Sequence, residues 1–249
     1  AKEIIMFWNL VRYEFKNVNK WYLALYGAVL AISVLISMSI TSISHTYNSY
    51  SNNSPYLLVL LLLAFGGLSV TLWIATIFLI IRRFKGSVYD RQGYLTLTLP
   101  VSEHQIISAK LLGGLIWSIL SYIVFILSVL IIFSLTPVVK EIPTLYRLMS
   151  PYLGYGWLYG LSLLTGSVTW ILSIYLSISI GQLFNEYRTA LAVLAYIVIS
   201  IVVSYIGFFL KVDDQINTLM IVGILKNILL GTIYYLGTYY ILKNKVNLQ

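Results

Sequence analysis

Charged residues are scarce in this chain, and their scarcity excludes a water-soluble fold. Only 10% of the 249 residues are charged, whereas 59% are hydrophobic and the mean hydropathy is +0.89. A soluble domain of this length needs about a quarter charged residues to cover its surface. Lipid must therefore cover most of the chain, and the composition predicts an all-α polytopic membrane protein that forms a single domain over residues 1–249.

Residue types that carry chemistry are also nearly absent. There is no cysteine, which excludes disulfides and thiolate chemistry. The two histidines, His45 and His104, fall on opposite sides of the membrane in the topology below, so we expect no metal site. No phosphate-binding loop, nucleophile elbow or His-Glu-x-x-His motif occurs in these residues. We therefore expect neither enzyme activity nor a bound cofactor in this chain.

Six apolar segments are long enough to cross roughly 30 Å of hydrocarbon as helices. The first is too long for the apolar part of a signal peptide, so we expect no cleaved leader. The six predicted spans are Trp21–Ser42, Tyr56–Ile81, Leu111–Leu135, Leu158–Phe184, Ala190–Leu210 and Thr218–Leu242.

The distribution of basic residues predicts the orientation. Most of the 16 Lys and Arg residues lie in the N-terminal segment, the 82–110 connection and the tail. The connections on the other side hold only Lys140, Arg147 and Lys211. Cytoplasmic connections carry the excess of Lys and Arg, so both termini are predicted to be cytoplasmic in a cell membrane. Because the basic residues flank spans, the net charge of +8 does not indicate nucleic-acid binding.

Residues 1–20 form a predicted amphipathic helix. Trp8, Val11 and Phe15 share one face at helical spacing, whereas Arg12 and Lys16 take the other. Such a helix lies in the headgroup layer. It is either an anchor or an elbow that transmits force into the first span.

The 82–110 connection is the longest charged segment. Ser102 and Gln105 match a helix capping box, so the third helix is predicted to begin near Glu103, before the membrane. The connection is either a solvated loop or a docking site for a soluble partner. Aromatic residues favour docking, because we expect no lipid to cover them and such residues are enriched at interfaces. These aromatic residues are Phe84, Tyr89 and Tyr94.

Lys226 interrupts the last span. It either snorkels to the outer interface or lines a cavity that binds substrate. Small residues such as Gly66 and Gly231 are expected to let helices pack closely rather than to act as gate hinges.

The order of these elements resembles a known family. An amphipathic N-terminal helix, two spans, a charged short helix, Leu-Pro-x-Ser, Lys and four further spans are similar to the permease subunits of ABC-2-type (type V) ABC exporters. Gly-Tyr-Leu-Thr-Leu-Thr-Leu-Pro-Val-Ser at 93–102, Ser-Ile-Gly-Gln-Leu-Phe at 179–184 and the ending Ile-Leu-Lys-Asn-Lys-Val-Asn-Leu add to the likeness.

The resemblance implies several functional features. The connection after the second span would hold a coupling helix that docks on a separate ATP-binding subunit, which would bind ATP and Mg. Short re-entrant helices would lie between the last two spans, around Phe208–Gly223. The coupling residues carried over are Phe84, Lys85, Tyr89, Asp90, Arg91 and Tyr94.

The resulting expectation is an ATP-driven exporter. Each permease would pair with a second copy or a paralogue, because six spans make half a pathway. Its cargo would be amphipathic or hydrophobic, with peptides preferred over drugs or lipid-linked material. An ion-coupled transporter and a membrane scaffold remain as alternatives; the first usually needs a carboxylate within the membrane.

Overall fold

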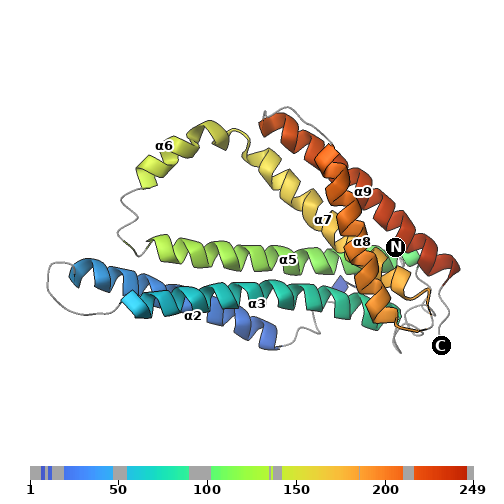
Figure 1. Cartoon of the computed structure of the whole chain (residues 1–249), viewed down its shortest axis with the longest axis horizontal. Helices are drawn as coiled ribbons and strands as arrows, with labels where there is room; N and C mark the ends of the chain where they lie inside the picture. Colours follow the sequence, from blue (N-terminus) through green and yellow to red (C-terminus); the bar gives the residue numbers. More distant parts are fainter. Residues whose placement is uncertain are drawn as a thin grey trace. The chain divides into compact units, whose positions relative to one another are not determined.

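The computed structural model describes residues 7–8, 11–12, 20–46, 55–89, 102–134, 136, 142–184, 186–209 and 216–245. All regular structure within these ranges is helical, and none of it is strand (Figure 1). The longer helices are α2 (Lys20–Thr46), α3 (Pro55–Val88), α5 (Glu103–Ser134), α6 (Ile142–Leu153), α7 (Gly156–Gly181), α8 (Arg188–Phe209) and α9 (Ile216–Asn244).

Six helices of this described part are long and apolar enough to cross a membrane, whereas α6 is too short. The prediction of an all-helical, multi-pass membrane protein is therefore confirmed. The helix bounds lie close to the predicted spans at most ends. The exceptions are the start of α5, which precedes the span as expected, and the end of α3, which continues past Ile81 to Val88. The apolar pattern explains the extension, because Ile80, Phe84 and Val88 recur every four residues and all three are buried.

The start of α5 confirms the predicted helix cap. The Ser102 hydroxyl accepts a hydrogen bond from the backbone N–H of Gln105 at 3.4 Å, and the helix begins at Glu103. Glu103 places an acidic side chain in the first turn, where the helix dipole favours it.

One connection differs from expectation, and another contains an additional helix. The suggested re-entrant segment Phe208–Gly223 is wrong from Ile216 onward, because α9 runs unbroken from Ile216 to Asn244. The connection between the third and fourth spans contains α6. Pro143 occupies its first turn, where proline costs no helical hydrogen bond.

The chain divides into two compact units. Unit 1 comprises Ala1–Lys16, Leu79–Leu115 and Gly154–Gln249, and unit 2 comprises Asn17–Phe78 and Ile116–Leu153. The ends of α3 and α5 that border the 82–110 connection therefore belong to unit 1, and the remainder of both helices to unit 2. Whether the chain is one domain stays a prediction.

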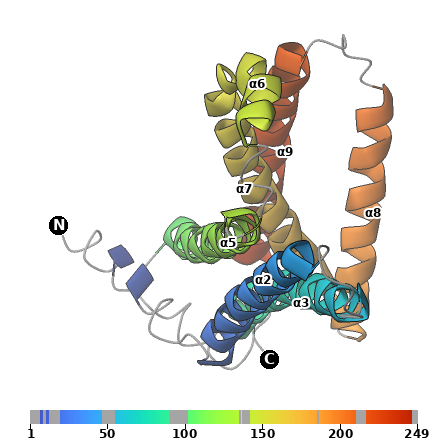
Figure 2. The same ribbon diagram turned by 90° about the vertical axis from the view of Figure 1, so that its left-hand side faces the viewer.

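Unit 1 is organised around α7, which packs along α9 and meets α8 (Figure 2). Glycines permit both approaches. A Cβ on Gly237 would lie 2.9 Å from Cδ1 of Leu176, and one on Gly181 would lie 2.5 Å from the backbone oxygen of Arg188. The α7–α8 turn is tight, and Tyr187 adopts a positive φ of 54°.

Unit 2 is held by a buried cluster of hydroxyl groups. The Tyr22 hydroxyl lies 2.6 Å from Thr76 Oγ1 and 2.8 Å from Ser121 Oγ, and the Tyr26 hydroxyl lies 2.9 Å from Ser121 Oγ. Thr76 and Ser121 also donate to carbonyls of their own helices. These bonds connect α2, α3 and α5 and satisfy polar groups that would otherwise be costly in an apolar interior.

The predicted amphipathic helix over residues 1–20 lies largely outside the described residues. The residues described there are helical at 7–8 and 11–12, with Val11 buried and Trp8 63% exposed.

Candidate functional site

The candidate coupling site lies in unit 1, where α3 ends and α5 begins. Of its six predicted residues, Phe84, Lys85 and Tyr89 are described, whereas Asp90, Arg91 and Tyr94 lie outside the described residues. At 1.5 Å per residue, the 34 residues of α3 extend roughly 50 Å, well beyond roughly 30 Å of hydrocarbon. The end of α3 can therefore project past the apolar layer, as the charges at Arg82 and Lys85 require.

Phe84 is fully buried within the chain. Its ring stacks on Tyr175 of α7 with centroids 3.9 Å apart and planes 9° apart. The expectation that Phe84 would lack cover within the chain is therefore wrong, because α7 supplies the apolar surface that lipid and water do not. Its burial needs no partner protein.

Tyr175 joins three helices. Besides stacking on Phe84 of α3, its hydroxyl donates to the backbone carbonyl of Lys110 in α5 at 2.9 Å. One buried α7 side chain thus holds both helices that border the 82–110 connection. We call Phe84, Tyr175 and the Lys110 carbonyl the tyrosine clamp.

Tyr89 follows α3 directly and also packs inward. Its hydroxyl donates to Ser179 Oγ of α7 at 2.7 Å. Its ring meets the Phe84 ring edge-on, with the ring centroids 6.0 Å apart. Burial raises the pKa of Tyr89 to about 12, although the Ser179 hydrogen bond acts in the opposite direction. The hydroxyl therefore remains neutral at physiological pH, and most of this aromatic side chain is unavailable to a partner.

Lys85 takes a different position from the two aromatic residues. Its Nζ donates to Oγ1 of Thr189 at 3.2 Å, in the first turn of α8. This exposed contact ties the end of α3 to the start of α8 within unit 1. Exposed pairs of this kind stabilise little, so it orients the side chain more than it holds the fold.

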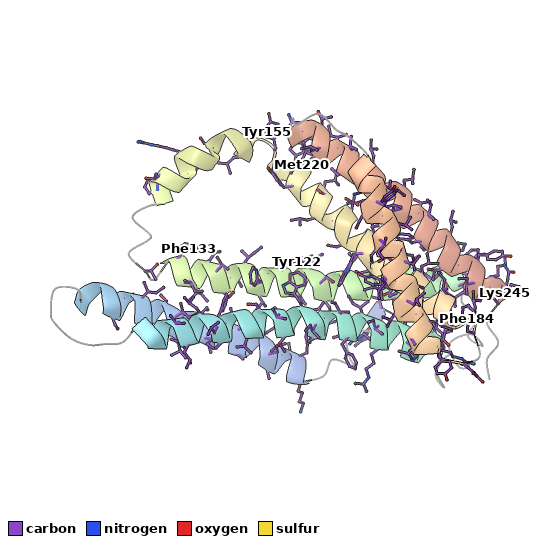
Figure 3. All side chains as sticks on the ribbon, in the orientation of Figure 1. Tyr122, Phe133, Tyr155, Phe184, Met220 and Lys245 are labelled. Carbon is purple, nitrogen blue, oxygen red and sulfur yellow. The ribbon has the colours of Figure 1, made fainter. Side chains whose placement is uncertain are left out.

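Exposed apolar side chains occur instead in the α7–α8 turn. Leu183 is 45%, Phe184 48% and Tyr187 79% exposed, beside the exposed Glu186. Figure 3 places the labelled Phe184 and Lys245 at the same end of unit 1. We call Leu183, Phe184 and Tyr187 the turn surface. Sequence reasoning included Phe184 in a span and missed it as a surface residue; the pair Glu186–Tyr187 before a new apolar run was the available signal.

His104 forms a second aromatic cluster that the sequence did not indicate. Its Nδ1 lies 2.8 Å from the Tyr235 hydroxyl, and its ring stacks on Tyr239 at 4.0 Å. Lys243 Nζ lies 5.6 Å from the centre of the Tyr239 ring. Tyr235, Tyr239 and Lys243 recur every four residues on α9 and therefore share the face that meets the start of α5.

Lys226 lies half-buried on α9, ten residues after the helix begins. The next residue, Asn227, faces α7, because its carbonyl accepts from Thr169 Oγ1 at 2.7 Å. The acids within the described ranges are Glu103 and Glu186, neither of them near the middle of a span. Both interpretations of Lys226, snorkelling and substrate binding, stay predictions.

The described residues contain no group of three His, Cys, Asp or Glu side chains able to hold a metal ion. Comparison with known proteins adds no assignment: no family model, no curated protein and no solved structure matches this chain.

Proposed function

We propose that this chain is the permease subunit of an ATP-driven exporter of the ABC-2 type. In this proposal it works as a pair, with a second copy or a paralogue, in the cell membrane with both termini in the cytoplasm. A separate ATP-binding subunit docks on the 82–110 connection and supplies the energy. The cargo is amphipathic or hydrophobic, most simply a peptide.

The tyrosine clamp is the observation that carries the proposal. A connection that only links two spans needs no buried attachment at its base. Here both bordering helix ends are held to α7 by a stacked ring and a hydrogen bond, so a force applied to the connection would move α7 as well. Rigid-body movement of packed helices is the usual way in which such a force becomes a conformational switch.

The composition of the spans favours this proposal over an ion-coupled transporter. Ion-coupled carriers generally place carboxylates within the membrane. The spans, where described, hold no acid except Glu103 in the first turn of α5.

The turn surface revises where the partner would bind. Because Phe84 is covered by α7, the docking site needs other aromatic side chains, and Phe184 and Tyr187 are exposed in the α7–α8 turn, near the end of α3. We therefore add Phe184 and Tyr187 to the proposed docking site, which already includes Lys85. Interface aromatics often cost about 2 kcal/mol or more of binding energy when truncated.

A test compares two matched surface variants. The tagged chain is purified, with any bound partner, from the membranes of the cells that produce it. Two activities are then measured: vanadate-sensitive ATP hydrolysis, and ATP-dependent efflux of a fluorescent amphipathic peptide from vesicles. We expect Tyr187→Ser to reduce both, since it removes an exposed ring at the docking site. Tyr205→Ser, which removes a 65% exposed ring on α8, is the control and should change neither. Absence of any ATPase in the complex would refute the proposed class.

Orientation is tested separately, since the chain has no native cysteine to interfere. A cysteine replacing Glu186 should resist an impermeant thiol reagent added to whole cells. One replacing Ser150, which is exposed on α6, should react. The reverse labelling would place the 82–110 connection outside and exclude an ATPase there.

A further inference from the structure

Helix α6 separates its residue types completely by face. At 100° per residue, the positions of the large apolar and aromatic residues fall on one continuous arc of the helix, and the opposite arc holds the rest. The apolar arc comprises Ile142, Leu145, Tyr146, Leu148, Met149, Tyr152 and Leu153; the polar arc comprises Pro143, Thr144, Arg147, Ser150 and Pro151.

The chain itself leaves the described part of the apolar arc uncovered. Tyr146 is 64% and Leu153 53% exposed, although both fall on that arc. Arg147 and Ser150, on the polar arc, are exposed as well. Apolar side chains that the chain leaves exposed on so short a helix, as at Tyr146 and Leu153, need an apolar phase outside the chain.

The connection to α7 identifies that phase. Two residues, Gly154 and Tyr155, separate the end of α6 from the start of α7 at Gly156, which is one of the six helices able to cross a membrane. The first turn of α7 exposes Trp157 (68%) and Tyr159 (40%), residue types that concentrate at the boundary between lipid and water. So short a link keeps α6 at that boundary.

We propose that α6 is a membrane-surface helix that binds phospholipid on the face where α5 ends and α7 begins. Its apolar arc lies among the upper acyl chains, while Arg147 stays in the headgroup layer near the phosphates. Helices of this kind bury their apolar face about 5–10 Å into the boundary. The proposal requires neither an ATP-binding partner nor a particular orientation of the chain.

The test measures depth on the two arcs of α6. Single cysteines replace Tyr146 and Leu153 on the apolar arc, and Arg147 and Ser150 on the polar arc, in the otherwise cysteine-free chain. Each purified variant carries a bimane label in vesicles of phosphatidylcholine and phosphatidylglycerol. Quenching is measured with lipids that bear a nitroxide high on the acyl chain, and with iodide present on both sides of the membrane.

We expect the nitroxide lipid to quench labels at 146 and 153 several-fold more than labels at 147 and 150, with the opposite order for iodide. Equal iodide quenching at all four positions would mean that α6 stands off the membrane, and would overturn the proposal. Protection of 146 and 153 from both quenchers would also overturn it, because protein, such as a second copy, would then cover the apolar arc. The same quenching pattern at 146 and 153 would show that neither substitution has changed the depth of α6 on its own.

Discussion

Helices α7 and α8 follow one another in unit 1, and both are apolar enough to cross a membrane, yet they differ sharply in packing. Half of the apolar stretch of α7 is buried within the chain, against 6% of that of α8. Small polar residues line the buried part of α7, among them Thr169, Ser173, Ser177 and Ser179. Helix α8 instead exposes large aliphatic side chains, among them Val193, Leu194, Ile197, Val198, Ile201 and Val202.

The comparison teaches what apolar composition leaves open. Lipid chains are as apolar as leucine, so apolar side chains alone give helices no reason to associate in a membrane. Small hydroxyl residues allow close approach and carry their own hydrogen bonds, as Ser173, Ser177 and Ser179 do toward carbonyls of α7. Packing on α7 and exposure on α8 therefore follow from residue size more than from hydrophobicity.

Truncating Tyr175 should give the largest effect. Tyr175→Ala removes a fully packed ring and should cost about 3–5 kcal/mol. This corresponds to a decrease of roughly 10 °C in Tm for a chain of this size. Ile201→Ala, on the exposed face of α8, is the control and should change Tm by roughly a degree or two. Thermal unfolding in detergent measures both, and equal losses would contradict the contrast between the helices.

The second largest effect is expected when a glycine of each helix is replaced by alanine, because the added methyl group should destabilise α7 but not α8. Gly181→Ala places Cβ 2.5 Å from the Arg188 backbone oxygen, so the α7–α8 turn must shift, at about 1–3 kcal/mol. Gly207→Ala on α8 meets nothing within 4 Å and should be neutral or stabilising. Tm values of the two variants check the difference, and a stable Gly181→Ala would show that the turn is loosely packed.

Removing the Tyr175 hydroxyl should have a smaller effect on stability, and it tests whether the tyrosine clamp takes part in coupling. Tyr175→Phe keeps the stack on Phe84 but loses the hydrogen bond to the Lys110 carbonyl, which should cost about 1 kcal/mol. The exposed Tyr240→Phe is the control. If the proposed function holds, Tyr175→Phe should also lower the cargo moved per ATP hydrolysed. An unchanged ratio with normal complex formation would remove the clamp from the coupling path.

The pH dependence at Tyr89 should be the weakest effect. Its folded-state pKa of about 12 lies above the ordinary value of 10, so folding favours the neutral hydroxyl. The resulting stabilisation is complete below pH 10 and is lost as pH rises from 10 towards 12. Tyr89→Phe should therefore flatten the decrease in Tm over that interval relative to the parent. Parallel profiles would mean that Tyr89 is not buried against Ser179.

Several parts of the structure could be predicted from neighbouring residues. The spans follow from runs of apolar residues, and the start of α5 follows from Ser102 and Gln105, because a helix cap involves residues three apart. The burial of Phe84 was also visible in part, since Ile80, Phe84 and Val88 repeat at helical spacing. It was missed because charges at Arg82 and Lys85 suggested a solvated segment.

The sequence by itself determined that the protein is helical and crosses a membrane, because hydrophobic length and scarce charge depend on no partner residue. Only the tertiary structure decided which aromatic rings are covered. His104 meets Tyr235, 131 residues away, and Tyr175 meets Phe84 through the packing of α7 against α3. Contacts at such separations depend on which helix faces meet, and apolar periodicity in a membrane does not specify this because lipid satisfies any apolar face equally.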